Sequence, residues 1–253
     1  MTARGEVRAG SAIRLLDHDP DLARSVRPDR VEEARRSALV DVVSLPRGPW
    51  DLDVEAHGCP YGLLLLDGLV SRTTLLGDVA ASELLGRGDV LVPAAPEESL
   101  VPADVRWTVL EPVCVALLDE RFLFVVRRWP ELAAALFGRI AAQSARLSMQ
   151  RALGHLPRVE DRLHGLLWFL AERWGRVTPR GVVVPLRLTH DMLGQLVGAK
   201  RPTVSLAIKA LEELGVVERR ADGAWLMLQA WSPPAAAGED ASAGAVVVPL
   251  PGR

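Results

Sequence analysis

The stretch from Leu188 to Leu228 constrains the fold of this chain more than any other. Thr189 is a residue type preferred at a helix N-cap, and apolar residues follow at helical spacing until Gly198. A glycine readily takes the left-handed conformation that ends a helix. Pro202 then stands at a helix start, where no backbone N–H is needed. The sequence therefore predicts two short amphipathic helices joined by a tight turn, a helix-turn-helix.

The second helix and the residues after it extend this prediction. The side chains expected on the buried face of that helix are Val204, Ile208, Leu211 and Leu214. Beyond Gly215, two short apolar segments at 216–220 and 225–228 flank an Ala-Asp-Gly-Ala turn, which is typical of a hairpin. The motif is thus expected to be a winged helix-turn-helix.

These residues are similar to the DNA-binding domain of the Crp/Fnr transcription regulators. The similarity is carried by Thr189 and by the runs 198–205 and 211–217, and it extends more weakly over nearly the whole chain. It implies an α+β chain with an N-terminal β-roll (cyclic-nucleotide-binding-like, a double-stranded β-helix), a long dimerisation helix and a C-terminal winged helix-turn-helix. The expected parts are residues 12–130, 131–154 and 155–230. The low-complexity tail at 231–253 is expected to be disordered.

The first half of the chain has the pattern of short apolar runs and turn residues that is typical of a β-roll. Helical patterns over residues 13–39, with Asp29 as an expected N-cap, precede short apolar runs separated by Gly, Pro and Asp. Such spacing favours a β-roll or barrel. The expected strands are 40–43, 63–66, 69–70, 90–92, 107–110 and 113–118, and the expected turns are 46–48, 67–68, 77–78 and 86–89.

The cyclic-nucleotide site that the resemblance implies is expected to be degenerate. Family members that bind a cyclic nucleotide hold its phosphate with backbone amides and an arginine. At the equivalent place this chain has Pro93, Pro96 and Pro102, and proline offers no amide donor. Arg106 is favoured as a solvated surface residue over a displaced phosphate ligand. The effector is left unknown.

The residues that usually hold metals or cofactors are sparse. Cys59 and Cys114 are the only cysteines, too few for an iron–sulfur or structural zinc site. His57 is the one candidate for an axial haem ligand in the roll, and with Cys59 it supplies two ligands where a zinc site normally wants four. Both are favoured as loop or strand residues, and Cys114 as an inert core thiol. We therefore expect no metal and no cofactor.

Composition limits the partners. The formal net charge is −2, so any contact with DNA must come from a local basic patch. The first residues contain no apolar segment long enough for a signal peptide, and no window approaches the ~20 apolar residues of a membrane span. A cytoplasmic location without membrane contact is the expectation.

A long helix is expected between the two parts, from Pro130 to about Leu153. Its apolar stripe consists of Leu132, Leu136, Ile140 and Leu147, with alanines between them. The stripe is best buried against a second copy of the same helix, with Leu136, Ile140 and Leu147 between the two chains, which predicts a two-fold homodimer. A further helix over 159–174 and a strand over 181–186 lead into the helix-turn-helix.

Arg201 is the strongest candidate for a contact with DNA bases, because it is at the start of the helix that would enter the major groove. Its guanidinium can bind guanine O6 and N7 together. Pro202 and Leu206 stand where well-known family members have a Glu and an Arg, so specificity must differ, with contacts to thymine methyl groups contributing. The expected DNA-binding set is Thr189, His190, Lys200, Arg201, Pro202, Thr203, Ser205, Leu206, Lys209, Arg219 and Arg220. Within it, His190, Lys200, Thr203, Ser205 and Lys209 are the candidates for phosphate contacts, and the two wing arginines for backbone or minor-groove contacts.

The leading interpretation is a dimeric, sequence-specific transcription regulator that is not an enzyme. Its expected partners are double-stranded DNA with an inverted-repeat operator, a second copy of the chain, RNA polymerase and an unknown small-molecule effector. Two alternatives remain open. A cupin-like β-roll enzyme would need several roll histidines, of which only His57 is present. A protein-interaction module would use the winged helix to contact protein instead of DNA.

Overall fold

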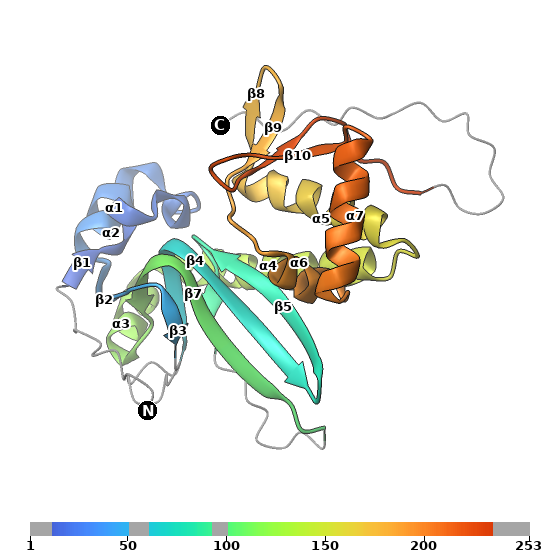
Figure 1. Ribbon diagram of the computed structural model, residues 1–253. Coiled ribbons are helices and arrows are strands. Elements are labelled where there is room, and N and C mark those ends of the chain that lie inside the picture. Colours follow the sequence, from blue (N-terminus) through green and yellow to red (C-terminus); the bar gives the residue numbers. More distant parts are fainter. Residues whose placement is uncertain (1–11, 51–60, 93–100, 235–253) are drawn as a thin grey trace. The chain divides into compact units, whose positions relative to one another are not determined.

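The computed structural model describes residues 12–50, 61–92 and 101–234 (Figure 1). The chain divides into two compact units, Met1–Arg146 and Leu147–Arg253. The expectations for His57, Cys59, Pro93, Pro96 and most of the C-terminal tail lie outside the described residues. Within the described ranges, no helix is long and apolar enough to cross a membrane.

The N-terminal unit opens with short elements: β1 (Ala12–Arg14), α1 (Leu15–His18), the 3-10 helices η1 (Pro20–Ala23) and η2 (Pro28–Arg30), and α2 (Val31–Ser37). Two details of the sequence expectation are wrong. Asp29 is not the N-cap of α2, since it lies within η2 and accepts hydrogen bonds from Arg27. Leu39 is no longer helical, because the chain leaves α2 at Ala38 to begin the first long strand.

An antiparallel sheet forms the body of this unit. Its strands are β2 (Leu39–Leu45), β3 (Gly48–Trp50), β4 (Leu63–Leu76), β5 (Val79–Gly86), β6 (Val90–Leu91) and β7 (Asp104–Leu117). The order is β1-β2-β7-β4-β5, while β3 pairs with β7 and β6 pairs with β4. β3 and β5 were not predicted, because β3 is short and β5 mixes small and polar residues, Ala80, Ala81, Ser82 and Glu83, with only two leucines.

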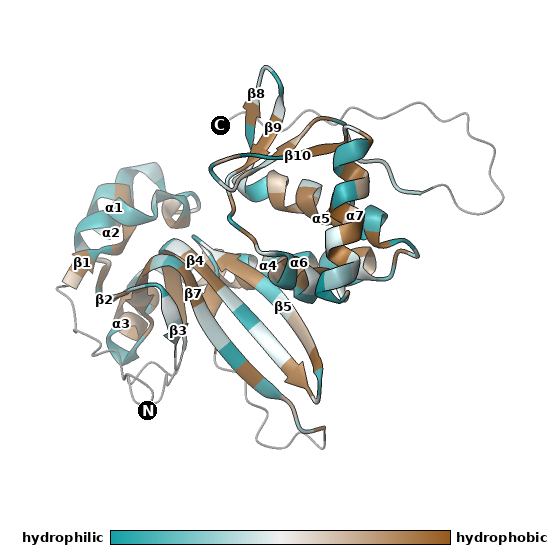
Figure 2. Cartoon of the chain, in the orientation of Figure 1, coloured by the Kyte–Doolittle hydropathy of each residue, from teal (hydrophilic) through white to brown (hydrophobic). Residues whose placement is uncertain are grey.

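Both faces of the sheet are covered, because neighbouring side chains on a strand point to opposite sides. On β4, Leu63 and Leu65 belong to one apolar cluster with Val109 and Trp107 of β7. Leu64 belongs to the other cluster, together with the N-terminal helices. In Figure 2, brown and teal segments alternate along β5 and β7.

The expected turn at Asp67-Gly68 is wrong: β4 runs through it as one strand. The pairing with β7 shifts register between Leu65 and Val70, which is the signature of a β-bulge. Gly68 has φ +90°, and a Cβ there would lie 2.3 Å from the carbonyl oxygen of Pro112. Glycine is therefore required for close approach of two strands here, not for a chain reversal.

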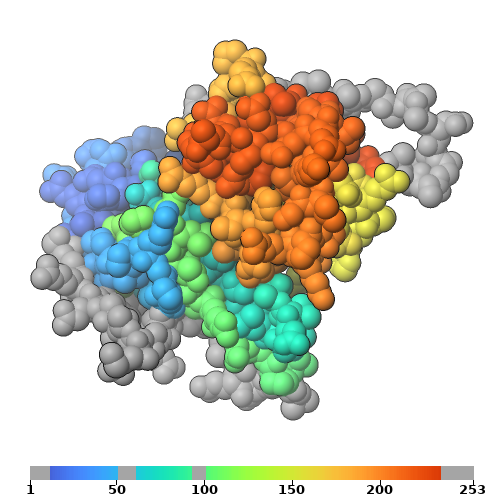
Figure 3. Space-filling model, viewed as in Figure 1, coloured from blue at the N-terminus to red at the C-terminus, as the bar shows by residue number. Residues whose placement is uncertain are grey.

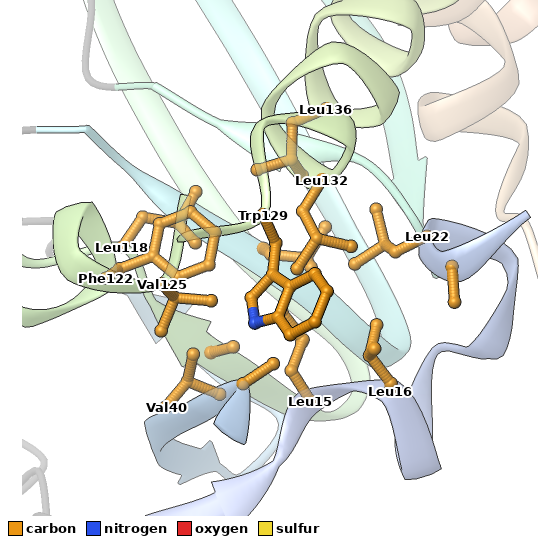
Figure 4. Close-up of a cluster of buried hydrophobic side chains, with 14 of the residues drawn as sticks. Leu15, Leu16, Leu22, Val40, Leu118, Phe122, Val125, Trp129, Leu132 and Leu136 are labelled. Atoms are coloured by element: carbon orange, nitrogen blue, oxygen red, sulfur yellow. The ribbon is translucent and has the colours of Figure 1, made fainter. Parts of the chain in front are cut away.

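Trp129 lies at the centre of the second cluster (Figure 4). It follows α3 (Glu120–Arg128), an element that the sequence analysis did not predict and that is capped by the Asp119 side chain accepting from Phe122 N at 3.0 Å. The indole is fully buried, and its Nε1 donates to Ser37 Oγ at 2.8 Å. The side chains around it come from α1, α3, the sheet and the next helix.

The predicted long helix is present as α4 (Pro130–Gly154). Its apolar stripe is divided, which corrects the expectation of one seam. Leu132 and Leu136 are buried in the core of their own unit, 0% and 8% exposed. Phe137 is 71% exposed and Ile140 40% exposed. Phe137 lies about 100° around the helix from Leu136, so the open face is centred about a quarter turn away, and Ile140, about 40° from Leu136, lies at its edge.

The C-terminal unit contains α5 (Val159–Trp174), β8 (Arg176–Thr178), β9 (Gly181–Val184), α6 (His190–Val197), α7 (Arg201–Glu213), β10 (Val217–Arg219) and β11 (Trp225–Met227). The predicted bounds of α5 are confirmed. The four strands form an antiparallel sheet in the order β10-β11-β9-β8. The two predicted helices and the hairpin are all present, so the winged helix-turn-helix is confirmed.

Candidate DNA-binding interface

α6 begins and ends where the sequence predicts. The Thr189 hydroxyl accepts from Met192 N at 3.1 Å, which satisfies one of the free amides of the first turn. Gly198 closes the helix with φ +67°, in the left-handed region. The Ala199 amide then donates to the carbonyl of Gly194 at 2.9 Å, and a Cβ on Gly194 would lie 2.3 Å from Ala199 O. The turn between the helices is therefore tight because Gly198 adopts positive φ and Gly194 leaves room for the Ala199 carbonyl.

α7 starts at Arg201 after Lys200 as N-cap, with Pro202 at the second helical position. Its buried face consists of Val204, Ala207, Ile208 and Leu211, and it packs against α5 and α6. The expectation that Leu214 is buried is wrong, since this side chain is 70% exposed. The helix ends at Glu213 and Gly215 turns the chain with φ +65°, so Val216 takes the buried position instead.

The opposite face of α7 is open to solvent and carries most of the predicted DNA-binding residues. Arg201, Pro202 and Thr203 are exposed in its first turn, and Lys200 is exposed just before it. Further along, Leu206 is 71% exposed. The Lys209 ammonium lies 3.6 Å from a Glu213 carboxylate oxygen in an exposed pair, an interaction that contributes little in water. α7 and the wing form the orange and red surface that faces the viewer in Figure 3.

His190 and Ser205 are brought together across the motif. The Nδ1 atom of His190, the first residue of α6, lies 2.8 Å from Ser205 Oγ on α7. The Ser205 hydroxyl also lies 3.1 Å from the carbonyl oxygen of Arg201, one turn earlier. These two predicted phosphate ligands therefore contact each other, and Ser205 also bonds to the first residue of α7.

The wing arginines are held by contacts within the domain. The Arg219 guanidinium lies 4.1 Å from the centre of the Trp225 ring and donates to Leu188 O at 3.0 Å. Partial burial lowers the pKa of the Arg219 guanidinium from its ordinary value. Arg220 pairs with Asp222, whose side chain also accepts from Ala224 N at 3.0 Å in the turn of the wing. Both guanidinium groups are thus placed at the wing by protein contacts.

One basic residue near these groups was not singled out from the sequence. Arg187 is exposed in the connection between β9 and α6, and its side chain lies within 3.3 Å of a Cβ built on Gly223 in the wing turn. The signal available in the sequence was its position two residues before the N-cap Thr189. It adds a positive charge between the wing and α6.

The N-terminal unit contains two further residues that the sequence analysis singled out, Arg106 and Cys114. Arg106 is exposed on β7, in agreement with a surface arginine. Cys114 is half-buried on the same strand, and burial raises the pKa of its thiol, which opposes thiolate reactivity. Among the residues that the structure describes, no three His, Cys, Asp or Glu side chains are grouped so that they would hold a metal ion.

Comparison with known proteins gives the same assignment for this region. Residues 161–230 match a family model described as the Crp-like helix-turn-helix domain. No curated protein sequence matches the chain.

Solved structures with the same fold cover most of the chain. A mutant of CooA from Carboxydothermus hydrogenoformans is 15% identical with a TM-score of 0.59, over 88% of this chain and 94% of that one. The c-di-GMP-responsive global regulator CLP of Xanthomonas campestris is 17% identical with a TM-score of 0.57, over 79% and 98%. TTHB099, a Crp-family transcriptional regulator from Thermus thermophilus, is 19% identical with a TM-score of 0.52, over 74% and 91%.

The match over residues 161–230 makes this part of the chain a Crp-like helix-turn-helix domain, which supports a DNA-binding transcription regulator. The antiparallel β unit, the long helix and the winged helix-turn-helix together share the fold of the solved regulators named above. The cupin-like enzyme and the protein-interaction module are not favoured, because the matched domain is that of DNA-binding regulators.

Proposed function

We propose that the chain controls transcription by binding an inverted-repeat operator as a homodimer, with the first turns of α7 in the major groove. The observation that carries the proposal is the exposed face of α7, where Arg201 stands at the N-terminal end of the helix. In helix-turn-helix proteins these are the residues that meet base edges. RNA polymerase is the proposed protein partner of the operator-bound dimer.

Arg201 is proposed to read a guanine, and Leu206 to contact a thymine methyl group. The planar guanidinium matches guanine O6 and N7, and such a pair contributes about 1–3 kcal/mol of discrimination. The exposed leucine has no polar atom to offer, so an apolar base contact is the one it can make. Lys200, Thr203, Lys209 and the wing arginines are proposed to contact the phosphates on either side.

The proposed dimer forms through the open face of α4. Ala134, Phe137, Ala141, Ser144 and Ser148 follow at spacings of three and four residues, the repeat of a coiled coil, and all are exposed. Small side chains at four of the five positions allow two helices to approach closely, and Phe137 supplies apolar area. In such a dimer, the two recognition helices lie about 34–36 Å apart, one turn of DNA.

Selection of bound sequences from a random DNA pool tests the proposal, with and without metabolites of a cell extract to expose an effector. An inverted repeat should emerge. The Arg201→Ala variant should bind that operator more weakly and lose preference at one symmetric pair of positions. Arg201→Lys is the matched control: it keeps the charge but not the two-pronged donor, so it should also lose the preference.

Lys209→Ala provides the contrast for a phosphate contact. It should weaken binding to all sequences alike and reduce the slope of log affinity against log salt by about one. If Arg201→Ala retains the full base preference of the parent, Arg201 does not read a base. If no sequence is enriched at all, the proposed function itself is wrong.

A further inference from the structure

The contact between His190 and Ser205 determines what the Ser205 hydroxyl can offer to DNA. Its oxygen lies 2.8 Å from His190 Nδ1 and 3.1 Å from the Arg201 carbonyl oxygen. A serine hydroxyl has one proton to donate and two lone pairs that accept. Two arrangements of protons are possible: one forms both hydrogen bonds, and the other forms only the bond to His190.

In the first arrangement, the hydroxyl donates to the Arg201 carbonyl, and the Nδ1–H of His190 donates to the hydroxyl oxygen. In the second, the imidazole carries its proton on Nε2, and the hydroxyl donates to Nδ1 instead. A doubly protonated imidazole allows only the first. In every case the single hydroxyl proton of Ser205 is used inside the protein, while at least one lone pair remains available.

The phosphate contact predicted for Ser205 from the sequence is therefore in conflict with its surroundings. Phosphate oxygens only accept hydrogen bonds, and the hydroxyl has no further proton to give. The available lone pair needs an N–H or O–H donor. On the floor of the major groove the donors are the exocyclic amino groups, N6 of adenine and N4 of cytosine.

We infer that Ser205 is a specificity-determining residue that accepts a hydrogen bond from the amino group of an adenine or a cytosine, and that His190 is the positioning residue that holds its hydroxyl in this state. The inference rests on the proposed function, because it requires α7 in the major groove. The inference adds a second base contact to that of Arg201. In this contact the protein accepts the hydrogen bond and the base donates it.

The place of Ser205 on α7 agrees with this role. It lies four residues after Arg201, so the two side chains stand on the same side of the helix, one turn or about 6 Å apart. Ser205 is half-buried between the two helices, and the neighbouring Leu206 is 71% exposed. A hydroxyl whose orientation is fixed by α6 loses less conformational freedom on binding than a freely rotating one.

The experiment uses the full-length protein and the operator selected above, changed at one base of one half-site at a time. Each adenine is replaced by purine, which lacks the 6-amino group, and each cytosine by 2-pyrimidinone, which lacks the 4-amino group. The parent should lose about 2–10-fold in affinity at one position, the range for a single neutral hydrogen bond. Ser205→Ala should bind the unmodified operator more weakly by a similar factor and should be indifferent to the amino deletion at that position.

Variants of His190 separate positioning from simple contact. His190→Asn places an amide nitrogen near the position of Nδ1, so the bond to Ser205 and the sensitivity to the amino deletion should be retained. His190→Leu removes the bond, frees the hydroxyl to rotate and should reduce that sensitivity toward the level of Ser205→Ala. Circular dichroism melting of each variant confirms that the domain is folded.

Neutral methylphosphonate groups, placed at one operator phosphate at a time, test the competing contact. Ser205→Ala should be as sensitive as the parent to every such change, because no phosphate contact is removed with the hydroxyl. Loss of sensitivity at one phosphate in Ser205→Ala, or equal sensitivity of parent and Ser205→Ala to every amino deletion, would overturn the inference. These results leave operator binding by the parent intact, so they are distinguishable from a failure of the proposed function, in which the parent itself selects no operator.

Discussion

The Arg146 guanidinium on α4 forms an ion pair with the carboxylate of Asp89, which is 1% exposed in the turn between β5 and β6. The second oxygen of this carboxylate accepts from Gly86 N at 2.8 Å. The Asp89 side chain therefore joins the turn at residues 86–89 to α4. Its partner Arg146 is the last residue of α4 that belongs to the N-terminal unit. Arg139, two turns earlier, makes the same kind of pair with the buried Asp19.

Removal of Arg146 should therefore destabilise the N-terminal unit. Arg146→Ala takes a charged partner away from a buried carboxylate, and hydrogen bonds to charged groups contribute about 1.5–3 kcal/mol. Urea denaturation should show a free energy of unfolding lower by about 2 kcal/mol. The control is Arg47→Ala, an exposed arginine in the same unit, which should change it by less than about 0.5 kcal/mol. Equal effects of the two substitutions would contradict the assigned ion pair.

Glu83 should make stability depend on pH. Its carboxyl is 8% exposed beside Arg72, and desolvation raises the pKa above its ordinary value of 4.5. A group with a raised pKa favours the folded state in its protonated form, so its contribution is complete at low pH and declines as the pH rises above about 4.5. Glu83→Gln mimics the protonated group, and it should therefore gain stability relative to the parent as the pH rises. Denaturation curves at pH 4 to 8 measure the difference, and a decline of the variant relative to the parent would refute it.

Two glycines of β4 and its hairpin should differ in their tolerance of alanine. Gly68→Ala places a Cβ 2.3 Å from the Pro112 carbonyl oxygen at φ +90°, so β4 or β7 must shift. Gly77→Ala also has positive φ, +57°, but nothing lies within 4 Å of the new atom. We expect a loss of about 3 kcal/mol or more for the first and about 1 kcal/mol for the second. Thermal denaturation of the two variants in parallel tests the role of the bulge.

The proposed dimer predicts opposite results for two exposed phenylalanines. Phe137 on α4 is 71% exposed and Phe124 on α3 is 68% exposed. Phe137→Asp should produce monomers in sedimentation, because an unpaired charge in an apolar seam costs several kcal/mol. Phe124→Asp should leave the dimer unchanged, as it lies outside the α4 face. Ile140→Asp, at the edge of that face, should also weaken the dimer. If Phe137→Asp sediments and binds DNA like the parent, the dimer does not form through this helix.

Cyclic AMP and cyclic GMP should not bind at micromolar concentrations. In the sequence, the resemblance to the cyclic-nucleotide-binding roll aligns Pro93, Pro96 and Pro102 with the segment whose amides would hold the phosphate, and proline has no amide N–H. Isothermal titration of each nucleotide into the protein should show no heat beyond dilution. Saturable binding in the micromolar range would show that another group in the roll holds the phosphate.

The sequence by itself determined the DNA-binding half of the chain. A residue type at a helix end acts through its own backbone, so Thr189 and Gly198 fixed the bounds of α6 without help from the rest of the fold. The helical spacing of α5 was likewise enough to predict its ends. The resemblance of the same stretch to Crp/Fnr regulators agrees with the domain match.

Only the tertiary structure decided which side chains each element buries and which atoms remain for function. The division of the α4 stripe depends on the residues that surround Trp129, and these come from distant parts of the chain. The sequence around Gly68 is typical of a turn, but in the structure this glycine allows β4 and β7 to approach closely. The residue that it contacts, Pro112, is 44 positions away in the sequence. Ser205 was predicted to contact a phosphate, and the sequence did not indicate that its hydroxyl lies 2.8 Å from His190 Nδ1. Such roles depend on partners brought together by folding, and local sequence carries no record of them.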